Sequence, residues 1–325
     1  LFASEIHDAA ASGDVTKIEA LIQEDAKCLN ETNNQGETPL LIAAKTNRTA
    51  ALELLLKYKA DPNMANHKGQ VPLIWPIYNG HAAAALALLE AGANFKISLP
   101  MNSTCVHRAA FFNMIEVLRF LIKHGADVNA VNSHNETPLL LAAGYQKEEA
   151  VKLLLEAGAN VEIAKKDSHQ TPLLMAAQSV DQTAILELLL AHKANLEART
   201  TQGCTPVMNA ASAKKIKALK FLVEHGARLD VENIYGESVL YSFLCNAHEL
   251  DIVKFLIEKG APVNDIILAA GVGRTDLVQK MLAQDPTLVN FKAASGKSAM
   301  TLAAISGHAD IVQLLLKAGA DVNTK

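Results

Sequence analysis

The tripeptide Thr38-Pro39-Leu40 returns as Thr137-Pro138-Leu139 and Thr171-Pro172-Leu173, with the variants Val71-Pro72-Leu73 and Thr205-Pro206-Val207. Counted from these sites, equivalent positions stand at residues 38, 71, 104, 137, 171, 205 and 238, which are 33 or 34 residues apart. One period of this length indicates a stack of similar units in which each unit packs on its neighbours. The sequence therefore predicts a repeat protein rather than a globule with one core.

The segment 36–69 shows what one unit forms. Thr38 can cap a helix with its hydroxyl, and Pro39 then occupies the first helical position, where its missing N–H costs nothing. Apolar residues fill 40–44, and the leucine-rich stretch 51–57 predicts a second helix. The unit is thus predicted to be a helix, a turn, a second helix and an extended finger. It can bury its apolar residues only by stacking.

These residues resemble the ankyrin repeat, whose pattern runs Gly-x-Thr-Pro-Leu-His-x-Ala-Ala, then Gly-His, then Leu-Leu-Leu-x-x-Gly-Ala-Asp-x-Asn. Residues 124–129 read His-Gly-Ala-Asp-Val-Asn and residues 318–323 read Ala-Gly-Ala-Asp-Val-Asn, so both match its last part. The resemblance covers the whole chain. It implies an all-α repeat solenoid, a stack of helix-turn-helix units with β-hairpin fingers, in a family that binds many unrelated partners.

Spacing divides the predicted repeats into two groups. Residues 1–262 hold eight repeats, with starts near residues 4, 38, 71, 104, 137, 171, 205 and 238. Before the ninth repeat the spacing falls to 26 residues, so one finger is shortened, and residues 263–325 hold repeats nine and ten. We expect the helices to stack across this seam while the row of fingers is interrupted. Segment 284–290 also resembles segment 24–30 of the first repeat more than any middle repeat.

Composition argues against several classes of function. Of the 325 residues 50% are hydrophobic and 20% charged, which is enough apolar material for a core, and the net charge is -4. No basic stripe points to nucleic acid, and no apolar run approaches the roughly 20 residues of a membrane helix. Four cysteines, at positions 28, 105, 204 and 245, form no Cys-x-x-Cys pair. We therefore expect reduced thiols in a cytoplasmic, monomeric protein.

The third repeat departs from the pattern, because Trp75-Pro76-Ile77 fills the place of Leu-Ala-Ala. Pro76 stands four residues after Pro72, where it is expected to remove a backbone hydrogen bond and kink the helix at a cost of about 3 kcal/mol. Trp75 is expected at a core position. Two interpretations stay open: a local repacking, or a kink that reshapes the surface beside it.

The finger of the next repeat, residues 95–103, is apolar where other fingers are polar. Ile97, Leu99 and Met101 alternate along it, and no Gly marks its tip. An exposed apolar finger is unusual unless something covers it. The sequence therefore predicts that these three residues contribute to a binding surface.

Aromatic residues follow the paired small residues in three successive repeats. Most repeats carry small or polar residues there, but repeats three to five carry Tyr78, Phe111, Phe112 and Tyr145. The resemblance places these positions on a concave surface of fingers and first helices. They either bind another protein or a peptide, or pack locally against the finger.

We predict no catalytic, cofactor or metal site. The eleven histidines follow the spacing of the repeat, so structural or solvated roles explain them. Cys105 lies two residues before His107, but no third group completes a nucleophile. Gly296-Lys297-Ser298 resembles the end of a phosphate-binding loop, but Phe291 occupies the place of the required glycine.

The leading hypothesis is a non-enzymatic scaffold for protein–protein interaction. The absent initiator Met and the absent polar terminal repeat suggest an alternative, the ankyrin targeting domain of a larger protein such as an enzyme or a secreted bacterial effector in the host cytoplasm. A third hypothesis makes the chain a substrate. The resemblance implies hydroxylation of Asn129 and Asn323, since Leu121 and Leu315 precede them at the family's spacing.

Overall fold

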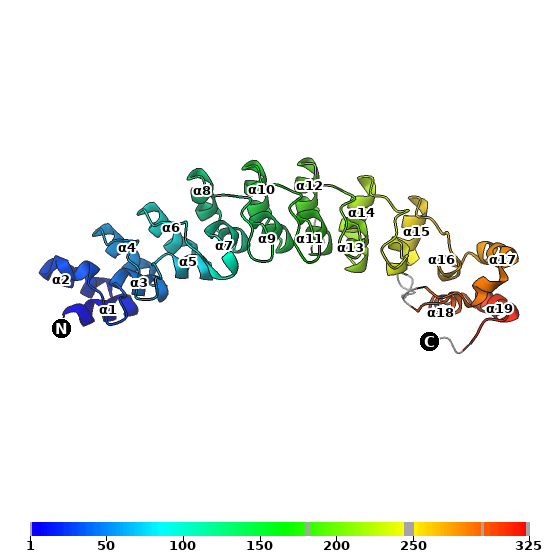
Figure 1. Ribbon diagram of the computed structural model, residues 1–325, viewed down its shortest axis with the longest axis horizontal. Coiled ribbons are helices and arrows are strands. Elements are labelled where there is room, and N and C mark those ends of the chain that lie inside the picture. The colour runs from blue at the N-terminus through cyan, green and yellow to red at the C-terminus, as the bar shows by residue number, and fades with distance from the viewer. Residues whose placement is uncertain (1, 180–182, 244–249, 294–295, 323–325) are drawn as a thin grey trace. The chain divides into compact units, whose positions relative to one another are not determined.

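The computed structural model describes residues 2–179, 183–243, 250–293 and 296–322. The chain forms two compact units, Leu1–Ile163 and Ala164–Lys325. Each is a series of paired helices joined by turns, which confirms the predicted all-helical repeat stack (Figure 1). The seam expected near residue 263 falls inside the second unit. Within the described ranges, no helix combines the length and the apolar character needed to cross a bilayer.

The first unit is built from helix pairs and two short 3-10 segments. Its elements are α1 (Phe2–Ser12), α2 (Val15–Glu24), η1 (Ala26–Asn30), α3 (Pro39–Lys45), α4 (Thr49–Lys57), α5 (Ile74–Asn79), α6 (Ala82–Glu90), η2 (Pro100–Asn102), α7 (Cys105–Phe111), α8 (Ile115–Lys123), α9 (Pro138–Gly144) and α10 (Glu148–Glu156).

The second unit continues the same alternation. Its elements are α11 (Pro172–Ser179), α12 (Ala184–Ala191), α13 (Pro206–Ser212), α14 (Ile216–Glu224), η3 (Val239–Ser242), α15 (Leu250–Glu258), α16 (Ile266–Gly271), α17 (Thr275–Gln284), η5 (Pro286–Asn290), α18 (Ala299–Ile305) and α19 (Ala309–Lys317).

The Thr-Pro pairs start first helices as predicted. The Thr38 hydroxyl accepts a hydrogen bond from the Leu41 N–H at 3.2 Å, and Pro39 is the first residue of α3. Thr137 caps α9 in the same way, accepting from the Leu140 N–H at 3.1 Å. Each cap satisfies a donor that the first turn of a helix leaves without a partner.

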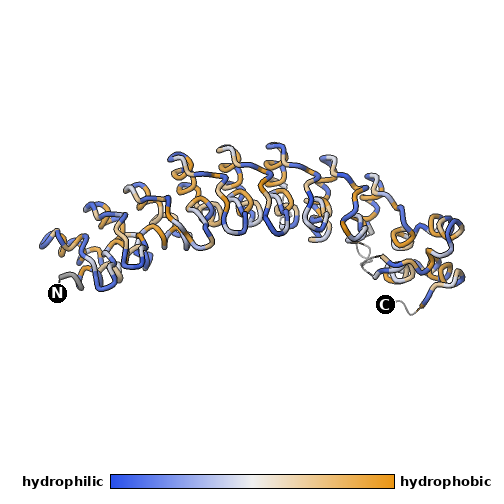
Figure 2. The backbone as a smooth tube through the Cα atoms, in the orientation of Figure 1, coloured by the Kyte–Doolittle hydropathy of each residue, from blue (hydrophilic) through white to orange (hydrophobic). Residues whose placement is uncertain are grey.

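Packing in the first unit runs from each helix to its neighbours. The first helices α1, α3, α5, α7 and α9 contact one another in succession, and so do the second helices α2, α4, α6, α8 and α10. Alanines such as Ala43 and Ala44 let the helices approach closely, while Leu52 and Leu118 fill the space between the rows, and all four are fully buried. Figure 2 shows hydrophobic residues along the helices and hydrophilic residues at many of the turns.

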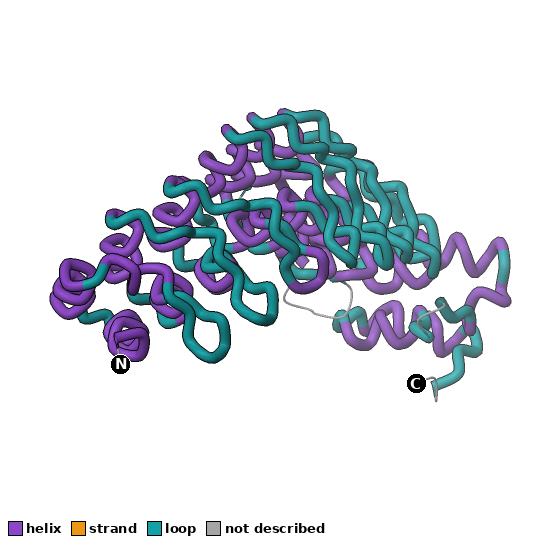
Figure 3. The backbone as a smooth tube through the Cα atoms, turned by 60° about the vertical axis from the view of Figure 1, so that its left-hand side comes forward, coloured by secondary structure: helices purple, strands orange, loops and turns teal. Residues whose placement is uncertain are grey.

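The fingers are tight loops that project from the helices (Figure 3). In the first of them the Asn33 N–H donates to the Glu37 carbonyl at 3.0 Å. The next tip is joined to it by the His67 N–H, which donates to the Gln35 carbonyl at 3.1 Å. Only one β-bridge occurs among the described residues, between Lys292 and Ser298. The fingers are therefore held by turn hydrogen bonds rather than by long strand ladders.

The kink predicted at Pro76 is wrong. The repeat spacing predicts a helix from Pro72, but α5 begins only at Ile74. Pro76 is thus its third residue, in the first turn, where backbone N–H groups have no acceptor within the helix. No helical hydrogen bond is lost there, so nothing bends the helix. Trp75 is half-buried rather than a core residue.

Two segments that resemble each other in sequence also share a structure. Residues 26–30 and 286–290 both form 3-10 helices after an aspartate. Asp25 accepts from the Lys27 N–H at 3.0 Å, and Asp285 accepts from the Thr287 N–H at 2.9 Å. At the shortened finger, the Tyr241 hydroxyl donates to the Asp265 carboxylate at 3.0 Å. That bond links the eighth and ninth repeats.

Candidate functional site

Four aromatic rings gather at the ends of three successive first helices. Tyr78 belongs to α5, Phe111 ends α7, Phe112 follows it, and Tyr145 follows α9. The Phe111 ring meets the Phe112 ring edge-on at 4.9 Å between centroids, and meets the Tyr145 ring edge-on at 4.5 Å. Edge-on pairs at such distances are favourable because the positive ring edge faces a negative ring face. The predicted aromatic residues thus form one surface, here called the aromatic cluster.

Backbone conformation places these rings. Asn113, directly after Phe112, has a φ of 55°, so the chain turns sharply as α7 ends. Gly80 ends α5 with a φ of 79°, and a methyl group there would lie 2.7 Å from the Phe112 ring. The Phe112 ring therefore lies against the bare backbone of the preceding repeat. Glycine provides both the left-handed conformation and the room.

Arg108 of α7 is the residue of the cluster that the sequence analysis missed. Its guanidinium carbon lies 4.3 Å from the Tyr78 ring centre, 5.4 Å from that of Phe111 and 4.9 Å from that of Phe112. Its Nη2 donates to the Tyr78 carbonyl. These distances suit cation–π attraction. The signal was available, since the equivalent position carries Ile42, Trp75 and Leu141 in neighbouring repeats.

Arg108 carries a charge that the described residues leave without a counter-ion. No carboxylate among them lies within 4.0 Å of it, and its Nε is buried without an acceptor. Burial lowers the pKa of Arg108 from its ordinary value. Arginine nevertheless keeps its proton at any physiological pH. The cluster is accordingly a cationic group edged by aromatic rings.

Exposure separates the predicted binding residues into two groups. Tyr78, Phe112 and Tyr145 are 38%, 37% and 52% exposed, and Met101 is 52% exposed. Phe111 and Ile97 are half-buried. Leu99 is only 3% exposed, so the expectation of an exposed Leu99 is wrong. The two hydrogen bonds between Leu99 and Ser103 and between Ser103 and Pro100 close the finger and turn that side chain inward.

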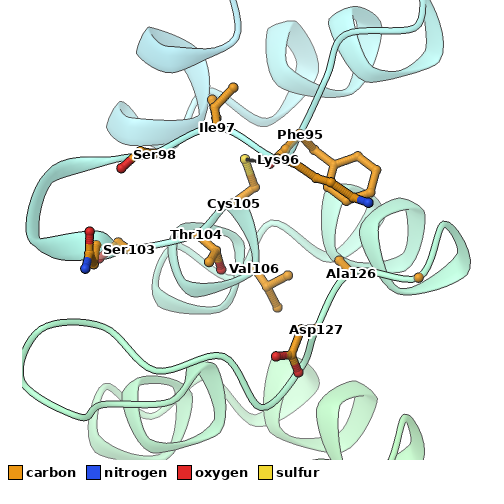
Figure 4. Close-up of a pocket in the computed structure, with 12 residues that line it drawn as sticks. Phe95, Lys96, Ile97, Ser98, Ser103, Thr104, Cys105, Val106, Ala126 and Asp127 are labelled. Carbon is orange, nitrogen blue, oxygen red and sulfur yellow. Dashed lines mark hydrogen bonds between the residues drawn. The ribbon is translucent and has the colours of Figure 1, made fainter.

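Beside this finger is a pocket of about 540 Å³ (Figure 4). Figure 4 shows Phe95, Lys96 and Ile97 on one stretch of chain, Cys105 and Val106 at the start of α7, and Ala126 and Asp127 on the following stretch. Ile97 is the one predicted binding residue that lines the pocket.

Cys105 and His107 both have structural partners. The Cys105 thiol donates to the Phe95 carbonyl at 3.2 Å, and burial raises its pKa to about 12. His107 is fully buried, with Nε2 2.9 Å from the Glu136 carbonyl and Nδ1 accepting from the Thr104 N–H at 3.1 Å. Burial lowers the pKa of His107. A neutral thiol and a neutral imidazole that hold backbone groups are not arranged as a nucleophile and its base.

Asn129, predicted as a hydroxylation site, also bridges repeats. Its Oδ1 accepts from the Asn160 N–H at 2.7 Å, and its Nδ2 donates to the Gly158 carbonyl at 3.5 Å. Asn323, the second predicted site, lies outside the described residues. Within the described ranges, no three His, Cys, Asp or Glu side chains are grouped as metal ligands would be.

Known families and proteins provide an independent comparison. The family described as "Ankyrin repeats (3 copies)" matches residues 6–98, 106–200, 173–267 and 266–325. An ankyrin repeat protein of Rickettsia felis is 32% identical over 124 residues, which is 37% of this chain and 40% of that protein. NF-kappa-B inhibitor alpha of Mus musculus is 32% identical over 115 residues, 34% of this chain and 37% of that protein.

A solved structure of an ankyrin repeat domain also resembles this chain. The human ASB11 ankyrin repeat domain matches with a TM-score of 0.54 and 28% sequence identity, over 67% of this chain and 96% of that domain. The alignments with the two curated relatives cover 40% and 37% of those proteins, less than half of either.

Proposed function

This chain belongs to the ankyrin repeat family, and on that premise we propose that it is a non-catalytic scaffold that binds a partner protein on its aromatic cluster. Ankyrin repeats generally bind proteins through a face of fingers and first helices. The cluster lies at the ends of first helices α5, α7 and α9, which belong to that face. The partner would lie across Tyr78, Phe112 and Tyr145, with the Arg108 guanidinium between the first two.

One observation carries the proposal: aromatic side chains that are 37% to 52% exposed stand side by side on neighbouring repeats. Each aromatic side chain can bury about 150–250 Å² in all, so the exposed share of three rings supplies a fraction of the roughly 800 Å² per partner in an ordinary interface. Aromatic residues and arginine are also the commonest hot spots in such interfaces. The cluster would therefore be the centre of a larger contact.

The equivalent face of the second unit offers a contrast. Gln178, Asn209 and Ser212 occupy the corresponding first helices and line a small polar pocket with finger residues. Rings and a guanidinium occur at these positions only in the middle repeats of the first unit, among the residues described. This difference favours the first unit as the binding unit.

Affinity capture with a designed pair of variants tests the proposal. The tagged full chain, its Phe112→Ala/Tyr145→Ala variant and a matched Gln178→Ala/Ser212→Ala control would be exposed to a lysate of cells that make the protein. Captured proteins would be quantified by mass spectrometry and the binding of each purified hit measured by calorimetry. We expect the ring variant to bind at least ~10-fold more weakly, because truncated hot spots cost that much or more.

The control shows whether a loss of binding is specific to the aromatic cluster. Gln178 and Ser212 lie on first helices of the second unit, at the repeat position that Phe111 occupies in α7, so removing them should leave binding unchanged. Circular dichroism melting curves would show that all three proteins are folded. A partner that binds the ring variant as tightly as wild type, or that loses affinity only in the control, would place the binding surface elsewhere.

A further inference from the structure

A recurring asparagine joins several of the repeats to the next. The Asn63 carboxamide oxygen accepts from the Asn94 N–H at 2.8 Å, and its NH₂ donates to the Gly92 carbonyl at 3.0 Å. The side chain thus satisfies one main-chain donor and one main-chain acceptor where the chain leaves a second helix for the following finger. One carboxamide does both because it carries an acceptor and donors on the same plane.

The same bridge occurs elsewhere in both units. Asn129 makes it to the Asn160 N–H and the Gly158 carbonyl at 2.7 and 3.5 Å. Asn290 makes it to the Asp321 N–H and the Gly319 carbonyl at 2.8 and 3.5 Å. The bridge is therefore a regular component of these repeats.

At the junction of Lys96 neither half of this bridge is present among the described residues. Lys96 stands 33 residues after Asn63 and 33 before Asn129, at the position of the bridging side chain. An ammonium group has no lone pair, so it cannot accept from the next repeat's N–H, which here belongs to Asp127. No described residue accepts from the Asp127 N–H or donates to the Gly125 carbonyl. A main-chain donor and acceptor are thus presented together.

The pocket of about 540 Å³ lies at this junction. Its lining includes Lys96, Gly125 and Asp127, so the two main-chain groups belong to residues of its wall. Phe95, Ile97 and Ala126 are half-buried and supply apolar surface in the same pocket (Figure 4). Its volume falls within the roughly 300–1,000 Å³ of small-ligand sites, which combine apolar walls with a few polar groups.

We propose that this pocket binds a primary carboxamide carried on an apolar group. The ligand's carbonyl oxygen accepts from the Asp127 N–H, and its NH₂ donates to the Gly125 carbonyl, as the side chains of Asn63, Asn129 and Asn290 do at their junctions. Its apolar part packs on Phe95 and Ile97. The carboxamide belongs either to a free small molecule or to a glutamine or asparagine side chain of a bound peptide, and both sources share this chemistry.

Nuclear magnetic resonance with two matched probes tests the site. The ¹⁵N-labelled full chain would be titrated with benzamide and with methyl benzoate, which has the same ring and carbonyl but no N–H. We expect benzamide to give a saturable shift of the Asp127 amide signal. Methyl benzoate should bind at least ~10-fold more weakly, since one hydrogen bond is lost and the Gly125 carbonyl stays unpaired.

Two variants of one residue sharpen the result. Lys96→Asn supplies the missing bridge from within the chain, so it should abolish the benzamide shift and raise the melting temperature. Lys96→Met removes the charge without supplying a carboxamide, so it should bind benzamide as wild type does. No saturation in wild type, equal binding of the ester, or undiminished binding in Lys96→Asn would each overturn the proposal.

The source of the carboxamide is decided by a second pair of probes. N-acetylglutamine N-methylamide imitates a peptide side chain, and the corresponding glutamate compound lacks the carboxamide. Tighter binding of the glutamine compound than of benzamide would identify a peptide ligand, and the reverse order a free aromatic amide. Binding of the glutamate compound as tightly as the glutamine compound would count against the site.

Discussion

At the scale of single residues, the contact between Gly80 and the Phe112 ring gives a direct test of the aromatic cluster. Gly80→Ala should destabilise the protein in two ways. A left-handed φ costs a residue with a side chain about 1–2 kcal/mol. The added methyl group would also lie 2.7 Å from the ring and displace it. Urea unfolding would measure the total, and the near-ultraviolet spectrum would report the moved rings.

The preceding repeat offers a matched control for this substitution. Gly69 has a φ of 72°, close to the 79° of Gly80, but a methyl group there meets no atom within 4 Å. Gly69→Ala should therefore cost only the backbone part of the free energy of unfolding and leave the near-ultraviolet spectrum unchanged. Equal losses of stability in the two variants would show that the ring does not rest on Gly80.

The Cys105 thiol predicts a dependence of stability on pH. Burial raises its pKa from 9.0 to about 12 in the folded protein. Because the folded state disfavours the thiolate, this stabilisation is complete below pH 9 and is lost as the pH rises toward 12. At pH 10, one unit above the unfolded pKa, the loss is about 1.4 kcal/mol, since one pKa unit corresponds to about 1.4 kcal/mol.

Comparison with Cys105→Ala isolates this effect from the titration of lysines and tyrosines. The difference in free energy of unfolding between wild type and Cys105→Ala should shrink by about 1.4 kcal/mol between pH 7.5 and pH 10. Urea unfolding at both pH values measures it. A difference that stays constant would show that the thiol titrates normally.

Single residues also show what the sequence alone could reveal. The repeat spacing brought Tyr78, Phe111, Phe112 and Tyr145 to equivalent positions, and the structure has them close together. Arg108 was not predicted because it precedes the paired alanines, whereas the aromatic pattern lies in the residues that follow them. The burial of Leu99 was not predicted. Alternation predicts which side chains share one side of a finger, but it does not predict which side the turn directs inward.

At the scale of elements, α5 shows how a helix accommodates a proline by starting later. Pro76 is in the first turn and removes no helical hydrogen bond, so Pro76→Ala should change the free energy of unfolding by no more than about 1 kcal/mol. In α9 the equivalent position is Ala142, the fifth residue of that helix. Ala142→Pro should destabilise by about 3 kcal/mol, because it removes a bond from the helix interior.

Urea unfolding of the two variants compares one proline removed with one introduced at the same position of the repeat. A large gain in stability for Pro76→Ala would mean that the proline strains α5 after all. The sequence showed that Pro76 conflicts with a helix that starts at Pro72, but it did not show that the helix starts later. The helix can begin two residues later than the spacing predicts because Val71, Pro72 and Leu73 form a turn in place of its start. The repeat spacing alone does not predict this turn.

At the scale of the whole molecule, the repeat length predicted the architecture because every unit has the same apolar requirement. Paired alanines and a row of leucines recur, so the same helix pair forms each time and contacts only its neighbours. Function did not follow in the same way. The aromatic cluster and the Lys96 junction are exceptions to the repeat, and an exception shows where to look without showing what binds.

Contacts between neighbours predict that damage stays local. Leu118 of α8 and Leu219 of α14 are fully buried and occupy the same position of their helices, one in each unit. Each Leu→Ala change should cost about 2–5 kcal/mol locally.

Because stability in a stack is nearly a sum of units and their interfaces, Leu118→Ala should speed amide hydrogen exchange most in α6, α8 and α10. Leu219→Ala should speed amide hydrogen exchange most in α13 and α14 and leave the amides of α6 protected. Mass spectrometry of exchange resolves these helices, and a uniform rise along the chain in both variants would mean that the two units unfold as one.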